Sequence, residues 1–444
     1  MWITHRCSRQ FVGVVAAFLY LLFATPGGAA NAELLIVNAR IFNGRDAQLS
    51  APSTLRISEG RVVSITAGAP VSLGGTVIDA GNRVVLPGLI DAHVHPSIPA
   101  SFVALRDLQP DYAAHRSAAE ARGMLLRGFT TIRDMGGPSF GLKQAIDEGV
   151  LVGPRIFPSG AMISQTSGHG DFRHRAASTV SNTGIDVMEQ RGYGRLADGE
   201  SAVLLAVREQ LREGAAQIKV AAGGGLSSNY DPLDSVQYLD AELRAAVRAA
   251  ADWGTYVAVH AYTPESIRRS VEAGVRSIEH AHLIDEPTMK LIAQRGVFVS
   301  PQAYLFSGNA FPMTGRAAVM PSGLDRMMQL AKKYEAKIAF GTDVFGGPRM
   351  YALQSKEFTA RLRWFDPLTI LRQATSVNGE LLALSGPRNP YAGAALGVLE
   401  PGAWGDLLVV EGNPLVDIGL LEDPDKNLRV IVKGGVVYKN TLAP

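Results

Sequence analysis

Eight short apolar segments alternate with helical patterns through the middle of this sequence, and few folds accommodate such an alternation. The β-type segments occupy residues 88–95, 129–135, 155–160, 216–222, 255–261, 276–282, 297–302 and 337–343. Helical patterns lie between them, as in residues 240–253 and 264–274. Strands that alternate with helices predict a parallel sheet with right-handed crossovers, and eight of them close into a barrel. The sequence therefore predicts an α/β fold with a (β/α)8 TIM barrel.

An open doubly wound sheet is the alternative architecture. Such a sheet more naturally has a Gly-x-Gly-x-x-Gly turn after its first strand. In this sequence the first predicted strand ends instead in the polar run His93, Val94, His95 and Pro96. This difference favours the barrel.

Both ends of the chain have a different pattern, in which short segments typical of strands, with alternating apolar and polar residues, are separated by tight turns. Examples are residues 33–42, 53–65, 76–87, 405–412 and 428–440. A pair of glycines at Gly434 and Gly435 indicates a hairpin turn in the last of these. We therefore expect a small β-sandwich domain built from residues 33–86 and 391–444, with the barrel in residues 87–390.

The start of the chain has the pattern of a secretory signal peptide. Basic residues precede an apolar run at residues 11–24, and Ala30, Asn31 and Ala32 form a small-x-small cleavage pattern. The run is shorter than the roughly 18 apolar residues that a membrane span needs. We expect a signal peptide at residues 1–32, and a secreted or periplasmic protein with no stable membrane anchor after cleavage.

Charge and cysteine content exclude some classes of function. The formal net charge is +2, which provides no strong field for nucleic acid, so no nucleic-acid partner is expected. The only cysteine, Cys7, lies in the predicted signal peptide. The mature chain therefore has no thiolate to act as nucleophile or ligand, and a metal site must use His, Asp, Glu or Lys.

Several predicted strands end in side chains that can bind a metal. These side chains are His93 and His95 on the first strand, Lys219 on the fourth, His260 on the fifth, His280 on the sixth and Asp343 on the eighth. Alternate residues of a strand face the same side, so both histidines of the first strand can point to the barrel axis. A lone strand histidine is more often a hydrogen-bonded core residue, but active sites of barrels lie at these strand ends. The whole set therefore favours a metal site.

Three other histidines are interpreted differently. His282 lies two residues after His280 and would face the same side, so we interpret it as a neighbour of the site. The alternative is that His282 replaces His280 as the ligand. His115 lies in a helical pattern and His174 in a polar loop, and both are expected at the surface.

These residues together resemble the amidohydrolase superfamily. The resemblance rests on PGLIDAHVHP (residues 87–96), the strand lysine, the two later strand histidines and GTD (residues 341–343). Gly405 replaces the usual Ala in the closing ADLLVVEG-like stretch. Within the superfamily the chain is most similar to the imidazolonepropionase-related amidohydrolases, which include Xaa-Pro and Xaa-Arg/Lys dipeptidases and ochratoxin-hydrolysing enzymes. The resemblance covers essentially all of the mature chain and implies hydrolysis of an amide bond.

The resemblance also implies two metal ions. His93 and His95 would bind the more buried ion, and His260 and His280 would bind the more exposed one. Imidazole and carboxylate ligands suit Zn²⁺, with Mn²⁺ or Co²⁺ as substitutes. Paired ions lower the pKa of a water molecule and polarise the scissile carbonyl.

Two residues would complete this chemistry. Lys219, carboxylated by CO₂, would bridge the two ions, which turns a costly buried cation into an anionic ligand. Asp343 would bind the buried ion and carry a proton from the attacking water to the leaving nitrogen.

Substrate contacts are expected in the loops that follow the strands. His169, in residues 164–172, matches a substrate-contacting histidine of the family. Tyr230, in residues 221–232, matches a tyrosine that helps to hold the substrate carboxylate in dipeptidase relatives. The three glycines of the second loop lack the helix start and the lysine of a phosphate-binding loop.

Two further loops bear on the substrate. Residues 171–199 are long for a simple connection and are predicted to form a lid, and residues 304–313 are predicted to form an apolar wall. Together with the tyrosine, these features favour a dipeptide or N-acyl amino acid with a hydrophobic or prolyl C-terminal residue, ochratoxin-like amides included.

Other functions are weighed against this one. A cyclic amidase would retain Lys219, whereas deaminases of the superfamily typically bind one metal and lack that lysine. A secreted binding protein without catalysis would have no need of Asp343. Homo-oligomers are common in the family, which by analogy extends to this chain.

Overall fold

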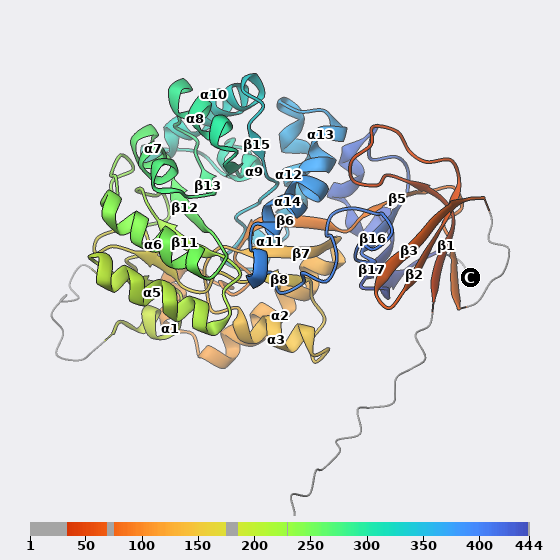
Figure 1. Ribbon diagram of the computed structural model, residues 1–444, viewed down its shortest axis with the longest axis horizontal. Coiled ribbons are helices and arrows are strands. Elements are labelled where there is room, and N and C mark those ends of the chain that lie inside the picture. The colour runs from red at the N-terminus through yellow and green to blue at the C-terminus, as the bar shows by residue number, and fades with distance from the viewer. Residues whose placement is uncertain (1–32, 69–74, 175–184, 229, 443–444) are drawn as a thin grey trace, which may run out of the picture.

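The computed structural model describes residues 33–68, 75–174, 185–228 and 230–442, so the predicted signal peptide lies outside the described residues. Figure 1 shows a barrel surrounded by helices, with a separate β-sheet at one end of the molecule.

All eight predicted barrel strands are present, although the last one is shorter than expected. They are β6 (Leu89–Val94), β7 (Phe129–Asp134), β8 (Arg155–Phe157), β11 (Ile218–Ala221), β12 (Val257–Ala261), β13 (Ser277–His280), β14 (Phe298–Ser300) and β15 (Lys337–Ile338). The third strand is interrupted after β8 and resumes as β9 (Met162–Ser164), which pairs in parallel with β11 and with β10 (Gly194–Leu196).

Backbone hydrogen bonds close the ring of strands. The Ala92 N–H donates to the Phe340 carbonyl over 2.8 Å and joins β6 to the segment after β15. The Ala216 N–H donates to the Pro158 carbonyl over 2.8 Å and joins the third strand to the fourth. All other neighbours pair in parallel. The predicted TIM barrel is confirmed.

Helices cover the outside of the barrel. The longer ones are α2 (Pro110–Leu126), α5 (Glu200–Glu213), α6 (Asp240–Asp252), α7 (Pro264–Ala273), α8 (Glu286–Arg295) and α10 (Met320–Lys333). The shorter ones are α1 (Phe102–Asp107), α3 (Phe140–Asp147), α4 (Val187–Gln190), α9 (Ala303–Phe306), α11 (Pro348–Tyr351), α12 (Glu357–Ala360), α13 (Pro367–Arg372), α14 (Asn378–Ala383) and α15 (Pro424–Asn427). In the described ranges, none of them has the length and apolar character required to cross a bilayer.

The sequence of α6 explains why such a segment forms a surface helix. Leu243, Ala246 and Ala250 recur at helical spacing and are buried. They pack in one apolar cluster with Val257 and Val259, whose side chains point outward from β12. An apolar stripe on a helix with a polar opposite face is stabilised by burial against a sheet.

Strands from both ends of the chain form the second sheet. They are β1 (Leu34–Ile41), β2 (Ser53–Ser58), β3 (Arg61–Ala67), β4 (Thr76–Asp79), β5 (Val84–Pro87), β16 (Leu407–Val410), β17 (Leu428–Lys433) and β18 (Val436–Asn440). The order is β18-β17-β16-β5-β1-β2-β3, with β4 beside β1.

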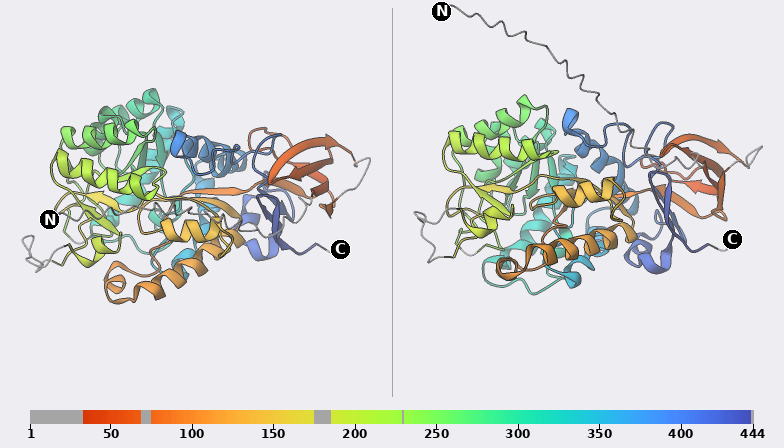
Figure 2. Two further views of the ribbon diagram at one scale, coloured as in Figure 1. Left: turned by 60° about the horizontal axis from the view of Figure 1, so that its bottom comes forward. Right: turned by 90° about the horizontal axis from the view of Figure 1, so that it is seen from below.

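The sheet is mixed, and its two halves share β1. The halves also share one apolar core, in which Ile57 and Val62 from the first half pack with Val409 and Val430 from the second. Both views of Figure 2 place this sheet at one end of the molecule, away from α5 and α6. The prediction that both ends of the chain build one β-rich unit is thereby confirmed, and its bounds at residues 33–86 and 391–444 stay a prediction.

Candidate active site

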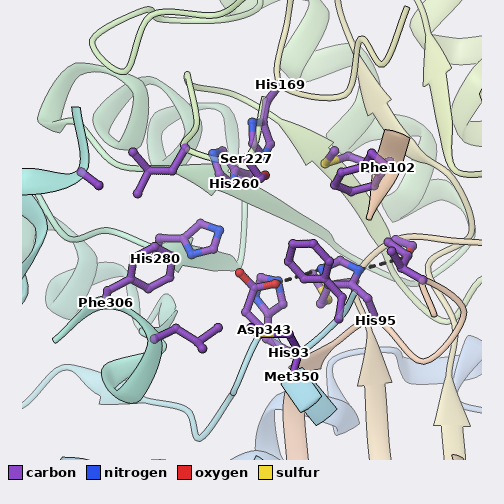
Figure 3. Close-up of a pocket in the computed structure, with 18 of the residues that line it drawn as sticks. His93, His95, Phe102, His169, Ser227, His260, His280, Phe306, Asp343 and Met350 are labelled. Atoms are coloured by element: carbon purple, nitrogen blue, oxygen red, sulfur yellow. Dashed lines mark hydrogen bonds and ion pairs between the residues drawn. The ribbon is translucent and has the colours of Figure 1, made fainter. Parts of the chain in front are cut away.

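A cavity of about 300 Å³ lies at the carboxyl ends of the barrel strands. Seven residues singled out from the sequence line it, namely His93, His95, His169, Lys219, His260, His280 and Asp343. In Figure 3, Asp343 lies between His95 on one side and His280 on the other. Residues from six separate parts of the sequence thus converge on one space.

Three of these side chains form a compact donor set. The Asp343 carboxylate oxygen lies 3.4 Å from His93 Nε2 and 3.1 Å from His95 Nε2. One ligand atom from each residue lies within 4.8 Å of the others. The Asp343 N–H also donates to the His93 carbonyl over 2.6 Å, which fixes the carboxylate beside the histidines. Two imidazoles and a carboxylate at one point are a donor set that suits a divalent metal ion.

Each of the four strand histidines has one ring nitrogen held by another group. The contacts are His93 Nδ1 with Glu279 at 2.8 Å, His95 Nδ1 with the Gly136 carbonyl at 2.9 Å, His260 Nε2 with the Gly224 carbonyl at 3.1 Å, and His280 Nδ1 with the Gln302 side-chain oxygen at 2.7 Å. Because these partners accept hydrogen bonds, the contacting nitrogen carries the proton. The other nitrogen is then left to coordinate a metal, as in metal sites with oriented histidines.

The protonation preferences of the histidines agree with this arrangement in three cases. Burial lowers the pKa of His93 to about 4. Burial also places the pKa values of His260 and His280 well below the ordinary value for histidine. His95 differs, because burial is outweighed by the hydrogen bond and charge of Asp343, which raise its pKa. The first three imidazoles are therefore neutral, as metal coordination requires.

Lys219 lies on β11 and is only 2% exposed. Its side-chain nitrogen makes no hydrogen bond or ion pair with another residue in the described part of the chain. Burial lowers the pKa of Lys219 to about 8, against the charges of Glu279 and Asp343, which raise it. The neutral amine, which is the form that reacts with CO₂, is therefore more populated than for an ordinary lysine.

A buried carboxylate below the site was not singled out from the sequence. Glu279 accepts hydrogen bonds from Arg133 at 2.8 Å and from Ser277 at 2.6 Å, besides its contact with His93. Burial opposes its ionisation, but Arg133 and His93 hold the pKa of Glu279 well below its ordinary value. The available signal was the presence of Arg133 and Glu279 within apolar strands, since fully buried charges require partners.

Replacing Glu279 with glutamine should weaken metal binding by about 10- to 100-fold, the usual effect of removing a partner that orients a ligand. The amide removes the anionic acceptor that fixes the His93 ring. The measurement is competition with a chromogenic zinc chelator. Glu357→Gln is the matched control, because Glu357 is also buried and ion-paired, at 2.7 Å from Arg361, but contacts none of the predicted ligands. Equal affinity in Glu279→Gln and the control would contradict the prediction.

The chain turns sharply where β13 ends. His280 and Ala281 have φ values of 78° and 59°, a left-handed conformation that side-chain-bearing residues rarely adopt. His280 lines the cavity, whereas His282 does not. His282 is completely buried, and its ring lies 4.5 Å from that of Phe306. The side chain that faces the cavity is therefore that of His280.

The two residues predicted to contact the substrate, His169 and Tyr230, lie in different places. His169 stacks on His260 with ring centroids 3.8 Å apart, and the Ser228 hydroxyl holds its Nδ1 atom at 2.9 Å. Tyr230 does not line this cavity, but lines an adjoining cleft together with Ser227. His115 and His174 are exposed, as expected.

The long loop at residues 171–199 is only partly described, since residues 175–184 lie outside the described residues. Its described part includes α4 and β10, and Tyr193 from this part reaches the cavity.

Apolar side chains form two walls of the cavity. Phe306 and Phe311 lie in the predicted wall at residues 304–313. A second wall was not predicted and contains Phe102, Phe172 and Phe345, with the first two rings stacked 4.3 Å apart. Figure 3 shows Phe306 and Phe102 on opposite sides of the histidines. An amide bound here would have apolar surroundings on either side.

Comparison with known proteins places the chain in a family. The amidohydrolase family matches residues 84–437. Ochratoxinase from Aspergillus niger is 32% identical over 384 residues, which cover 80% of this chain and 76% of the relative. A solved prolidase complexed with N-methylphosphonate-L-proline is 36% identical with a TM-score of 0.82, and a solved Xaa-Pro dipeptidase with bound methionine in its active site is 31% identical with a TM-score of 0.80. Each alignment covers 92% of this chain and 100% of the other. The chain belongs to the amidohydrolase family and is a metal-dependent hydrolase that acts on carbon–nitrogen bonds.

Proposed function

We propose that this protein hydrolyses the amide bond of a dipeptide or N-acyl amino acid whose C-terminal residue is hydrophobic or prolyl, ochratoxin-like amides included. The observation that carries the proposal is the convergence of four histidines, a lysine and an aspartate in a cavity with two apolar walls. The names of the relatives, an ochratoxinase, a prolidase and a Xaa-Pro dipeptidase, support the same class of substrate.

The proposed cofactor is a pair of divalent ions, with Zn²⁺ as the expected metal. His93, His95 and Asp343 would hold one ion, and His260 and His280 the other. Lys219 would lie between them after its neutral amine has added CO₂ and released a proton to give an anionic carbamate. When bound, such ions supply Lewis acidity toward the carbonyl and lower the pKa of a water molecule.

Asp343 is the proposed proton carrier. Burial opposes its ionisation, but His93 and His95 hold the pKa of Asp343 below its ordinary value. The carboxylate is thus an anion that accepts the proton of the attacking water. It then donates that proton to the leaving nitrogen as the carbon–nitrogen bond breaks, which gives a carboxylic acid and an amine.

The walls of the cavity select and orient the substrate in this proposal. Phe306 and Phe311 would contact the group on one side of the amide, and Phe102 and Phe172 the group on the other. His169, fixed by Ser228 and stacked on His260, can donate or accept a hydrogen bond at the substrate. The surrounding apolar surface also excludes bulk water, which strengthens electrostatic interactions at the reacting atoms.

The test is a substrate panel measured on protein prepared with zinc and bicarbonate. We expect N-acyl-phenylalanine, N-acyl-proline and Xaa-Pro dipeptides to be hydrolysed faster than lactones or phosphotriesters. Metal analysis of the same sample should give roughly two ions per chain. Preferred hydrolysis of a cyclic amide, which Lys219 would equally support, would replace the proposed substrate. Metal binding without turnover of any compound would favour a binding protein.

Export is a second proposal, based on the pattern at residues 1–32. Protein recovered from the periplasm or medium should begin at Glu33 when sequenced from its N-terminus. Recovery of a chain that retains residues 1–32 would contradict cleavage.

A further inference from the structure

One arginine joins two loops over the active-site cavity. Arg316 lies in the short 3₁₀ helix Gly315–Val319, which follows β14 and α9. Its guanidinium donates to the backbone carbonyls of Asp231 at 3.1 Å, Leu226 at 2.8 Å and Ser228. These three carbonyls belong to the loop that follows β11. Among the described residues, no carboxylate forms an ion pair with Arg316, and its hydrogen bonds go to these backbone carbonyls.

Both of the joined segments line the cavity. Residues 226 and 227 contribute from the β11 loop, and residues 311–314 and 317 contribute from the segment around Arg316. The Arg316 contacts therefore fix the distance between the β11 loop and the segment at residues 311–317. A guanidinium suits this task because its five donors have a rigid planar arrangement, whereas a lysine ammonium is a flexible point charge.

The same loop positions His169. The Ser228 hydroxyl lies 2.9 Å from His169 Nδ1, and the Asp231 carboxylate lies 3.4 Å from that nitrogen. Asp231 also accepts a hydrogen bond from the Gly225 N–H at 2.7 Å, which stabilises the loop from within. Arg316 thus holds the backbone of the two residues that hold His169. Figure 3 shows His169 and Ser227 next to His260 at the cavity.

We infer that Arg316 is a positioning residue that sets the β11 loop, and through it His169, for substrate binding. It acts through the loop and does not touch the reacting atoms. The inference rests on the proposed function for its kinetic consequence, while the effect on the loop is independent of the substrate. Loss of the Arg316 hydrogen bonds should weaken substrate binding more than it slows the chemical step. The predicted metal ligands lie on or directly after the barrel strands and are not held by Arg316.

The experiment compares Arg316→Ala, Arg316→Lys and Arg326→Ala with the full-length wild type, using the best substrate of the panel. In Arg316→Ala, KM should rise roughly tenfold while kcat stays within about threefold, since the charged hydrogen bonds that hold the β11 loop are lost. The KM of Arg316→Lys should lie between the KM of the wild type and that of Arg316→Ala. Arg326 is the matched control, because its guanidinium donates to one backbone carbonyl, that of Ile284, in a segment that does not line the cavity.

Two further readouts separate positioning from general damage to the fold. Added guanidinium ion should partly restore KM in Arg316→Ala but not alter Arg326→Ala. Hydrogen exchange of the backbone amides at residues 223–228 should be faster in Arg316→Ala, with unchanged metal content. Unchanged KM and exchange in Arg316→Ala would overturn the inference, as would a loss of bound metal. If the wild type hydrolyses none of the panel, the proposed function fails, and the exchange measurement still decides whether Arg316 holds the loop.

Discussion

Replacing Lys219 with alanine should lower kcat/KM by roughly 10³-fold, because the loss of an anionic bridge weakens the electrostatic stabilisation that paired metals supply. Lys219 is buried at the cavity, and its side-chain nitrogen has no hydrogen-bonding or ion-pairing partner among the described residues. A carbamate formed on this side chain would have the metal ions as its partners. Metal analysis of Lys219→Ala should give fewer than two ions per chain. Small carboxylic acids such as acetate should restore part of the activity, because they can occupy the space of the missing carbamate.

A half-buried lysine in the sheet domain provides the control for this prediction. Burial also lowers the pKa of Lys433 to about 8, and its ammonium donates to the Gly153 carbonyl over 2.6 Å. Lys433 lies on β17 in the sheet domain and does not line the cavity. Lys433→Ala should therefore keep its metal and its kcat/KM. Full activity with two metals in Lys219→Ala would contradict the carbamate bridge and leave a mononuclear mechanism as the better explanation.

Replacing Asp343 with asparagine should lower kcat by about 10²- to 10⁴-fold, the range expected when a general acid–base group is lost. Asparagine retains the size of the side chain and one oxygen, but it cannot carry a proton between water and the leaving nitrogen. The decrease in kcat should be larger for a substrate whose leaving group is a basic alkyl amine than for an activated anilide. The nitrogen of the anilide leaves with less need of a proton. The measurement is steady-state kinetics on this matched substrate pair.

Asp406→Asn is the control for the aspartate. Asp406 is buried and ion-paired with Arg155 at 3.0 Å, at the junction of the barrel and the sheet domain. Its replacement should change stability but should not alter the ratio of the two substrates. An Asp343→Asn protein that retains wild-type kcat on both substrates would exclude Asp343 as the proton carrier.

The sequence predicted the parts of the molecule that follow from periodic patterns. Alternation of strands and helices predicted the barrel, and the rule that barrel sites lie at strand ends placed His93, Lys219 and His260 in one cavity. That these residues bind metal stays a prediction. The signal peptide at residues 1–32 also stays a prediction.

Other features depend on contacts between residues that are distant in the sequence. Arg133 reaches Glu279 across 146 positions, and no local pattern reveals such a pair. His280 faces the cavity only because the chain turns with a positive φ at the end of β13. Loop conformations have no period either, which is why the Phe102 wall and the position of Tyr230 in the adjoining cleft were not predicted.

The sheet built from both termini has a consequence for how the chain is made. β5 lies between β1 and β16, so the partner of one β5 edge is residues 407–410, which leave the ribosome after the entire barrel. Until then the nascent protein carries an apolar strand with an open edge, a known template for aggregation. We therefore expect the N-terminal strands to be the part of the nascent chain that is exposed to aggregation for the longest time. A premature stop just before β16 would release a complete barrel whose second sheet lacks strands β16, β17 and β18.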